Sequence, residues 1–87
     1  MVSVYVIEGR ETGKRYVGIT RQLARRLAAH ARKASEGGQI IGGFALLHTE
    51  EFPDYATARE REQFLKSGQG RRWLAERYPR TRPAGGG

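Results

Sequence analysis

Two short segments near the start of the chain most constrain what it can fold into. Residues 2–7 and 15–19 are rich in β-branched and aromatic side chains, and a polar link that contains Gly9 and Gly13 joins them. Paired segments of this composition around a glycine-containing link predict a β-hairpin. Antiparallel pairing in such a hairpin would bring Tyr5 and Tyr16 close together.

An amphipathic helix is expected directly after the hairpin. Thr20 can cap a helix over about residues 21–34, in which two leucines and an alanine form an apolar stripe. Residues three or four positions apart share a face of a helix, so Arg26 and His30 lie together on a different face from the leucines. The predicted helix therefore buries its leucines and leaves Arg26 and His30 available.

The rest of the chain predicts one more strand and two more helices. Residues 44–48 are nearly all apolar, which indicates a third strand in a buried or central position. Helices are expected over about 55–66 and 71–78, and the Pro/Gly/Arg segment 79–87 is expected to be a disordered tail that follows a single domain over residues 1–78. The fold class is therefore α/β: a small three-stranded antiparallel sheet flanked by helices in the order β-β-α-β-α-α.

Composition favours a nucleic-acid partner. The 87 residues carry a net charge of +7 and a pI near 10.6, which is typical of nucleic-acid binders, although an acidic membrane surface would also attract them. The chain has no cysteine, which excludes thiolate catalysis, disulfides and cysteine-based zinc sites. It contains no apolar run long enough to span a bilayer and no signal-peptide pattern, so a soluble, cytoplasmic protein without membrane contact is expected.

Five side chains together offer the chemistry of phosphodiester cleavage. They are two phenols, a guanidinium, an imidazole and a carboxylate: Tyr5, Tyr16, Arg26, His30 and Glu62. These groups are roughly what metal-assisted hydrolysis of a phosphodiester requires. Taken singly, each has an ordinary explanation, because strand tyrosines bury their rings, helix arginines are solvated and Glu62 can pair with Lys66 one turn later.

The order of these groups also resembles a known family. Residues 3–5 (Ser-Val-Tyr) and 16–18 (Tyr-Val-Gly) form two short motifs, residues 23–30 carry the arginine and the histidine, and residues 58–66 space an alanine, a glutamate and a lysine four apart. In combination they resemble the GIY-YIG nuclease superfamily, in its small stand-alone single-domain form, over residues 2–74. The sequence departs from that pattern at Ser3, where glycine is usual, and in having no asparagine.

The resemblance implies a divalent-metal-dependent endonuclease that hydrolyses phosphodiester bonds in DNA. It implies that Tyr16 or His30 activates the attacking water, while Tyr5 holds the water or the phosphate. Arg26 would stabilise the pentacoordinate phosphorane, and Glu62 would bind Mg²⁺ or Mn²⁺. A structure-specific role in DNA repair or recombination comes from the resemblance alone.

Several alternatives stay open. The chain could be a non-catalytic nucleic-acid-binding module or an adaptor of the same fold, RNA is not excluded as the substrate, and a protein partner could supply specificity. The oligomeric state is not predicted. Basic residues spread along the chain could line a substrate channel: Arg10, Lys14, Arg15, Arg21, Arg32, Lys33, Arg71 and Arg72.

Overall fold

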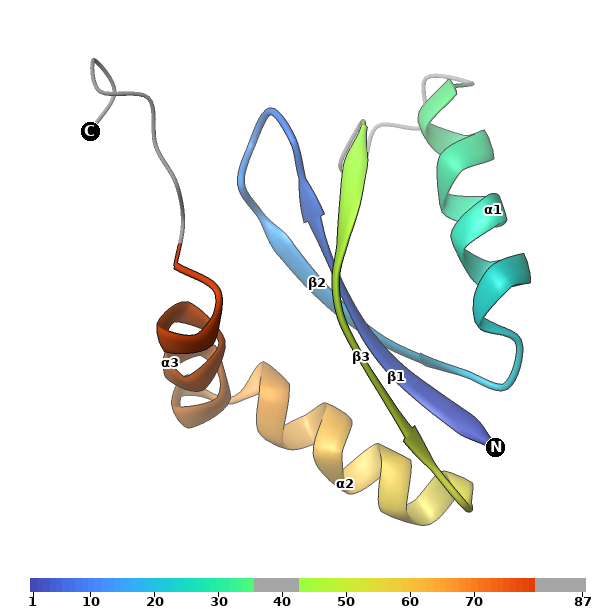
Figure 1. The fold of residues 1–87 in the computed structure, drawn as a ribbon, viewed down its shortest axis with the longest axis vertical. Coiled ribbons are helices and arrows are strands. Elements are labelled where there is room, and N and C mark those ends of the chain that lie inside the picture. The colour runs from blue at the N-terminus through green and yellow to red at the C-terminus, as the bar shows by residue number, and fades with distance from the viewer. Residues whose placement is uncertain (36–42, 80–87) are drawn as a thin grey trace.

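A three-stranded antiparallel sheet forms the centre of the fold (Figure 1). In the computed structural model, which describes residues 1–35 and 43–79, strand β1 (Val2–Gly9) pairs with β2 (Arg15–Thr20) on one side and with β3 (Phe44–Phe52) on the other. Residues 2–7 of β1 are all buried, whereas β2 and β3 are only half-buried. The most β-branched segment of the chain therefore occupies the middle of the sheet, where both its edges and both its faces are covered.

The predicted hairpin joins β1 and β2. Its turn closes with hydrogen bonds from the Gly13 N–H to the Gly9 carbonyl and from the Gly9 N–H to the Lys14 carbonyl, both 2.9 Å long. Gly13 has a φ of 72°, a left-handed conformation that glycine adopts without steric cost. In the resulting register Tyr5 lies opposite Gly18 and Ile7 lies opposite Tyr16. Because alternate residues of a strand share a face, both tyrosines lie on the same face of the sheet, as the hairpin prediction requires.

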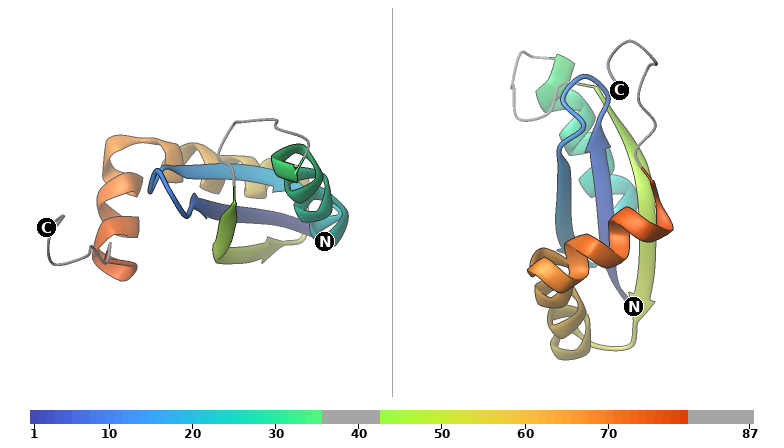
Figure 2. Two further views of the ribbon diagram at one scale, coloured as in Figure 1. Left: turned by 90° about the horizontal axis from the view of Figure 1, so that it is seen from above. Right: turned by 90° about the vertical axis from the view of Figure 1, so that its left-hand side faces the viewer.

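Helices cover both faces of the sheet (Figures 1 and 2). Helix α1 (Leu23–Ser35) lies on one side, and α2 (Tyr55–Lys66) and α3 (Gly68–Arg77) lie on the other. The apolar clusters follow the alternation of β1. Toward α1 the cluster contains Tyr5, Ile7, Leu23 and Leu27, and toward α2 and α3 it contains Val2, Val4, Val6, Ala58, Leu65 and Leu74. Among the described residues, no helix combines the length and the apolar composition that crossing a membrane requires.

Strand β3 corrects one prediction. The sheet order is β2-β1-β3, so β3 lies at an edge, and the expectation of a central third strand was wrong. The register shifts by one residue where Val6 pairs with His48 and Ile7 pairs with Leu46, which leaves Leu47 as the extra residue of a β-bulge. Phe44 packs beside Ile7 and Leu47 packs into the opposite cluster, as the alternation of a strand requires, and the bulge places His48 opposite Val6. The apolar run therefore reflects an edge strand with apolar contacts on both faces of the sheet instead of a central position.

The helix boundaries match the predictions in part. Helix α2 covers the predicted range, and the Asp54 carboxylate accepts a 2.8 Å hydrogen bond from the Thr57 N–H at its start. Thr20 makes a local turn, in which its hydroxyl accepts from the Gln22 N–H, so α1 begins two residues later than predicted.

Helix α3 begins at Gly68, three residues before the predicted start, with Ser67 as its N-cap. A glycine-rich start has low helix propensity, and here tertiary packing overrides it. The predicted tail over 79–87 lies outside the described residues, apart from its first position.

Candidate active site

Tyr5 is the most deeply buried of the five candidate residues, with 3% of its surface exposed. Its ring lies across Gly18 of β2, and a Cβ atom added to Gly18 would lie 2.4 Å from both Cζ and the hydroxyl oxygen of Tyr5. Side chains do not tolerate such an approach. The glycine of the second motif is therefore required by the tyrosine of the first, so packing explains why these two residue types occur together.

Two residues of α1 reach the phenol of Tyr5. His30 Nε2 lies 3.1 Å from the Tyr5 hydroxyl oxygen, and a hydrogen bond joins them. The His30 ring meets the rings of Tyr5 and Phe44 edge-on, with centroids 6.0 Å apart in each case. Arg26, one helical turn before His30, is exposed, and its charge and a hydrogen bond act on the same phenol. The i, i+4 spacing in the sequence thus puts both side chains of α1 at one hydroxyl group.

The surroundings of Tyr5 favour its protonated form. Burial raises the pKa of Tyr5 above its ordinary value, since a phenolate loses its hydration there. The positive charge and the hydrogen bond of Arg26 oppose this rise, and the negative charge of Glu62 adds to it. Tyr5 is therefore a neutral phenol at physiological pH, which suits a group that orients a water molecule or a phosphate by hydrogen bonding.

Glu62 comes from the opposite layer of the fold. It lies on the face of α2 that also carries Ala58 and Leu65, and 9% of its surface is exposed, whereas Glu60 is exposed. Lys66, one turn later, donates a 3.0 Å hydrogen bond to Glu62 Oε2. The carboxylate nevertheless acts electrostatically on Tyr5, which faces α1. The candidate site therefore combines groups from both layers of helices around β2.

Glu62 could hold a divalent cation only with help from other ligands. In residues 1–32 and 43–79 no group of three or more histidine, cysteine, aspartate or glutamate side chains could surround a metal ion. Magnesium is commonly held by one or two carboxylates, with water and substrate phosphate oxygens completing its shell. Glu62 fits that arrangement as a nearly buried carboxylate that is ion-paired with Lys66, whose side chain is 55% exposed and can move away from it.

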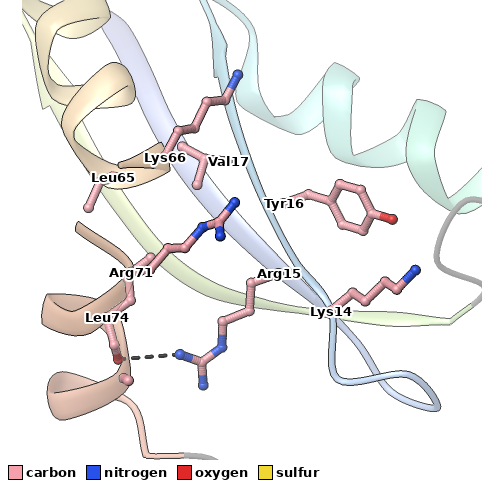
Figure 3. A pocket seen from close by; sticks show the side chains of 9 residues that line it. Lys14, Arg15, Tyr16, Val17, Leu65, Lys66, Arg71 and Leu74 are labelled. Carbon is pink, nitrogen blue, oxygen red and sulfur yellow. Dashed lines mark hydrogen bonds between the residues drawn. The ribbon is translucent and has the colours of Figure 1, made fainter. Parts of the chain in front are cut away.

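Tyr16 is the last of the five candidate residues. It packs against the cluster formed by Tyr5 and Ile7, on the same face of the sheet as Tyr5. In Figure 3 its ring projects from β2 toward the α1 side. The structure therefore brings Arg26, His30 and Glu62 into hydrogen-bonding or electrostatic reach of Tyr5, and it places Tyr16 two residues from Gly18 on the adjoining strand.

A groove beside β2 is the feature that sequence patterns did not predict. It has a volume of about 690 Å³ and lies between β2 and the helices α2 and α3 (Figure 3). Its lining is Lys14, Arg15, Tyr16, Val17, Leu65, Lys66, Arg71, Leu74 and Ala75. Three of the basic residues that were expected to line a channel are among them. The apolar part of the lining depends on how α3 packs against the sheet, and no local sequence pattern predicts this packing.

Comparison with known proteins supports the fold and the family. The family model that describes the GIY-YIG catalytic domain matches residues 1–75 of the sequence. The solution NMR structure of the UPF0213 protein BH0048 from Bacillus halodurans is similar, with 28% sequence identity and a TM-score of 0.54 over 90% of this chain and 86% of that chain. No curated protein matches the sequence.

Proposed function

Because the chain belongs to the GIY-YIG catalytic-domain family, we propose that it is a divalent-metal-dependent endonuclease that hydrolyses phosphodiester bonds in DNA. Family membership supports a nuclease-type activity on nucleic acid. The observation that carries the proposal is the environment of Tyr5, whose buried phenol is hydrogen-bonded to His30 and lies within electrostatic reach of Arg26 and Glu62. A tyrosine that serves only as core packing does not need a histidine and an arginine at its hydroxyl.

In the proposed reaction Tyr16 activates the attacking water. His30 is hydrogen-bonded to Tyr5 through Nε2, so we assign it to fixing the position of that phenol. Tyr5, as a neutral donor, then orients the water or a phosphate oxygen. Free tyrosine titrates near ~10, so Tyr16 needs a nearby positive charge to lose its proton.

Arg26 and Glu62 stabilise the negative charge of the transition state. The guanidinium of Arg26 can contact two phosphate oxygens of the phosphorane at once, which the point charge of a lysine cannot do as well. Glu62 would hold Mg²⁺ or Mn²⁺, and such an ion neutralises charge on the leaving oxygen. Lys66 must first release the carboxylate, because its ammonium group lies 3.0 Å from Glu62 Oε2.

The same ion pair favours a second candidate function. A carboxylate that is already neutralised by Lys66 suits a nucleic-acid-binding module that has kept the fold without turnover. Such a module would bind DNA in the presence of a chelator and never cleave it. Its positive charge alone would explain the binding.

A cleavage assay separates the two functions. Purified wild type, Glu62→Gln and Glu60→Gln are incubated with labelled single-stranded, duplex, flap and branched DNA, in magnesium, manganese or EDTA. We expect metal-dependent cleavage by the wild type and by the exposed control Glu60→Gln, and none by Glu62→Gln. Equal cleavage by all three proteins would contradict the role of Glu62, and binding without cleavage of any substrate would support the binding module.

A further inference from the structure

Two basic grooves lie at opposite ends of β2. The α3 groove is the one described above, beside the start of the strand. The α1 groove lies beside its end, has a volume of about 560 Å³ and is lined by Ile19, Thr20, Arg21, Gln22, Arg25, Arg26, Ala29 and Tyr55. Neither lining contains an aspartate or a glutamate. Both grooves are therefore suited to an anionic ligand.

The α3 groove combines cations with an apolar wall. The guanidinium of Arg15 already makes hydrogen bonds within the protein, because it donates to Glu8 and to the carbonyl oxygens of Leu74 and Tyr78. The side chain of Arg15 is 8% exposed. Lys14 and Arg71 are exposed, and Arg71 points into the space between β2 and α3 (Figure 3). Apolar side chains of β2, α2 and α3 line the same space. Cations next to an apolar wall match the phosphate and the sugar or base of a nucleotide.

The α1 groove has the same character with an aromatic side chain added. Arg21, Arg25 and Arg26 all belong to it, and all three are exposed. Tyr55 at the start of α2 is 42% exposed and provides a ring on which a base can stack. Arg26 belongs to both this groove and the candidate active site, so the groove opens directly onto the reacting groups.

The position of β2 connects the two grooves. It is an edge strand, and in the described part of the chain its only strand partner is β1. Strand β2 has six residues, and the five steps between them, of about 3.3 Å each, span roughly 17 Å. Tyr16 and Gly18 lie within this span, and Glu62 approaches it from α2. The grooves thus lie on either side of the proposed catalytic groups.

We propose that one unpaired strand of DNA lies along the free edge of β2, with phosphates in both grooves and the scissile phosphate between them. Each groove has the volume of a small-molecule site, roughly 300–1,000 Å³, which suits a nucleotide of a single strand, and a base can stack on Tyr55 only where it is unpaired. This inference rests on the proposed function and specifies its substrate class: DNA that is unpaired around the cut, as in a flap or a splayed end.

The test measures binding without cleavage. A fluorescently labelled single-stranded octanucleotide is titrated in EDTA, by anisotropy at several salt concentrations, against three proteins besides the wild type. The α3-groove variant is Lys14→Gln with Arg71→Gln, and the α1-groove variant is Arg21→Gln with Arg25→Gln. The matched control is Arg59→Gln with Arg72→Gln, which removes two exposed charges of α2 and α3 that line neither groove.

Each groove variant should bind about tenfold more weakly than the wild type, and the slope of log K against log salt should fall by about 1.4, or about 0.7 for each lost phosphate contact. The control should change affinity by less than about twofold, and the groove variants should weaken binding of the matching duplex less than binding of the single strand. If the control weakens binding as much as the groove variants do, the path is wrong. The proposal would also be overturned if the duplex bound more tightly than the single strand and lost as much affinity as the single strand in both groove variants. Because the assay contains no metal, its outcome does not depend on whether Glu62 supports cleavage.

Discussion

At the scale of single residues, Gly18 determines where the phenol of Tyr5 lies. Replacement by alanine would put a methyl group 2.4 Å from the ring, and Tyr5 cannot move outward because it is buried. We expect Gly18→Ala to fold but to cleave DNA about 100-fold more slowly, since displacements of about 1 Å in a catalytic constellation can have effects of that size. Cleavage rates and thermal melting check this. Gly68→Ala, at a glycine with nothing within 4 Å of the added Cβ, should keep the wild-type rate.

Lys66 provides a second prediction at this scale, about metal binding. Its ammonium competes with a cation for Glu62, and an i, i+4 ion pair with an exposed partner contributes about 0.3–0.5 kcal/mol. Lys66→Met should therefore bind Mn²⁺ about twofold more tightly in the absence of DNA, as measured by calorimetry. Weaker binding in this variant would mean that Lys66 supports the metal instead of competing with it.

The sequence indicated candidate residues but not the contacts between them. The four-residue spacing selected Glu62 over Glu60, and the structure places Glu62 on the buried face of α2. The hydrogen bond between Tyr5 and His30 joins residues 25 positions apart, and no local pattern encodes such a contact. Residue types and spacing indicate chemistry, whereas distances between elements depend on packing.

At the scale of elements, α3 depends on a close approach to α2. A Cβ added to Gly70 would lie 1.9 Å from the Phe64 carbonyl oxygen, so the first turn of α3 packs directly against the end of α2. We expect Gly70→Ala to lower the free energy of unfolding by about 1–3 kcal/mol, because backbone atoms must move. Urea denaturation measures this loss. At the open position Gly68, alanine should be neutral or stabilising, by up to about 1 kcal/mol. A similar loss for both variants would point to a general effect of side chains at the start of α3.

Helices and strands were predicted correctly where a local sequence signal agrees with the tertiary packing. The bounds of α2 were predicted because Asp54 and the apolar spacing agree with the final packing. The edge position of β3 was missed because both faces of the sheet carry apolar clusters, so an edge strand is apolar on both sides. The early start of α3 was missed because its first turn contains two glycines, which have low helix propensity. Both misses have one cause, namely tertiary contacts that outweigh local propensity.

At the scale of the whole molecule, a polar network connects β3 to the two C-terminal helices. Glu50 accepts two hydrogen bonds from Arg61, of 2.9 and 3.0 Å, and its Oε2 lies 2.7 Å from His48 Nε2. His48 Nδ1 in turn lies 2.6 Å from the Tyr78 hydroxyl oxygen. The guanidinium of Arg61 also lies about 5 Å from the ring centroids of Phe64 and Trp73. These hydrogen bonds connect the edge strand β3 to α2 and to Tyr78, the residue that follows α3.

The network makes stability depend on pH in a defined direction. Burial tends to raise the pKa of Glu50, but the hydrogen bonds and charges of Arg61 and His48 outweigh it and hold the pKa below its ordinary value. A carboxylate with a lowered folded-state pKa contributes stability that is present above its unfolded-state pKa and is lost as the pH falls through the folded value. Glu50→Gln should therefore cost about 1–2 kcal/mol at pH 7 and little at acidic pH. A pH-independent difference in melts of the two proteins would contradict this origin.

The bonds of Arg15 to the last helix have a consequence for protein synthesis. Arg15 donates to carbonyl oxygens 59 and 63 residues further along the chain, so the wall of the α3 groove is assembled only when translation has passed residue 78. A ribosome-bound chain that has completed only the hairpin and α1 carries both tyrosines but neither Glu62 nor this wall. Under the proposed function, nascent chains would thus be unable to attack nucleic acid beside the ribosome until α3 has packed against Arg15 of β2.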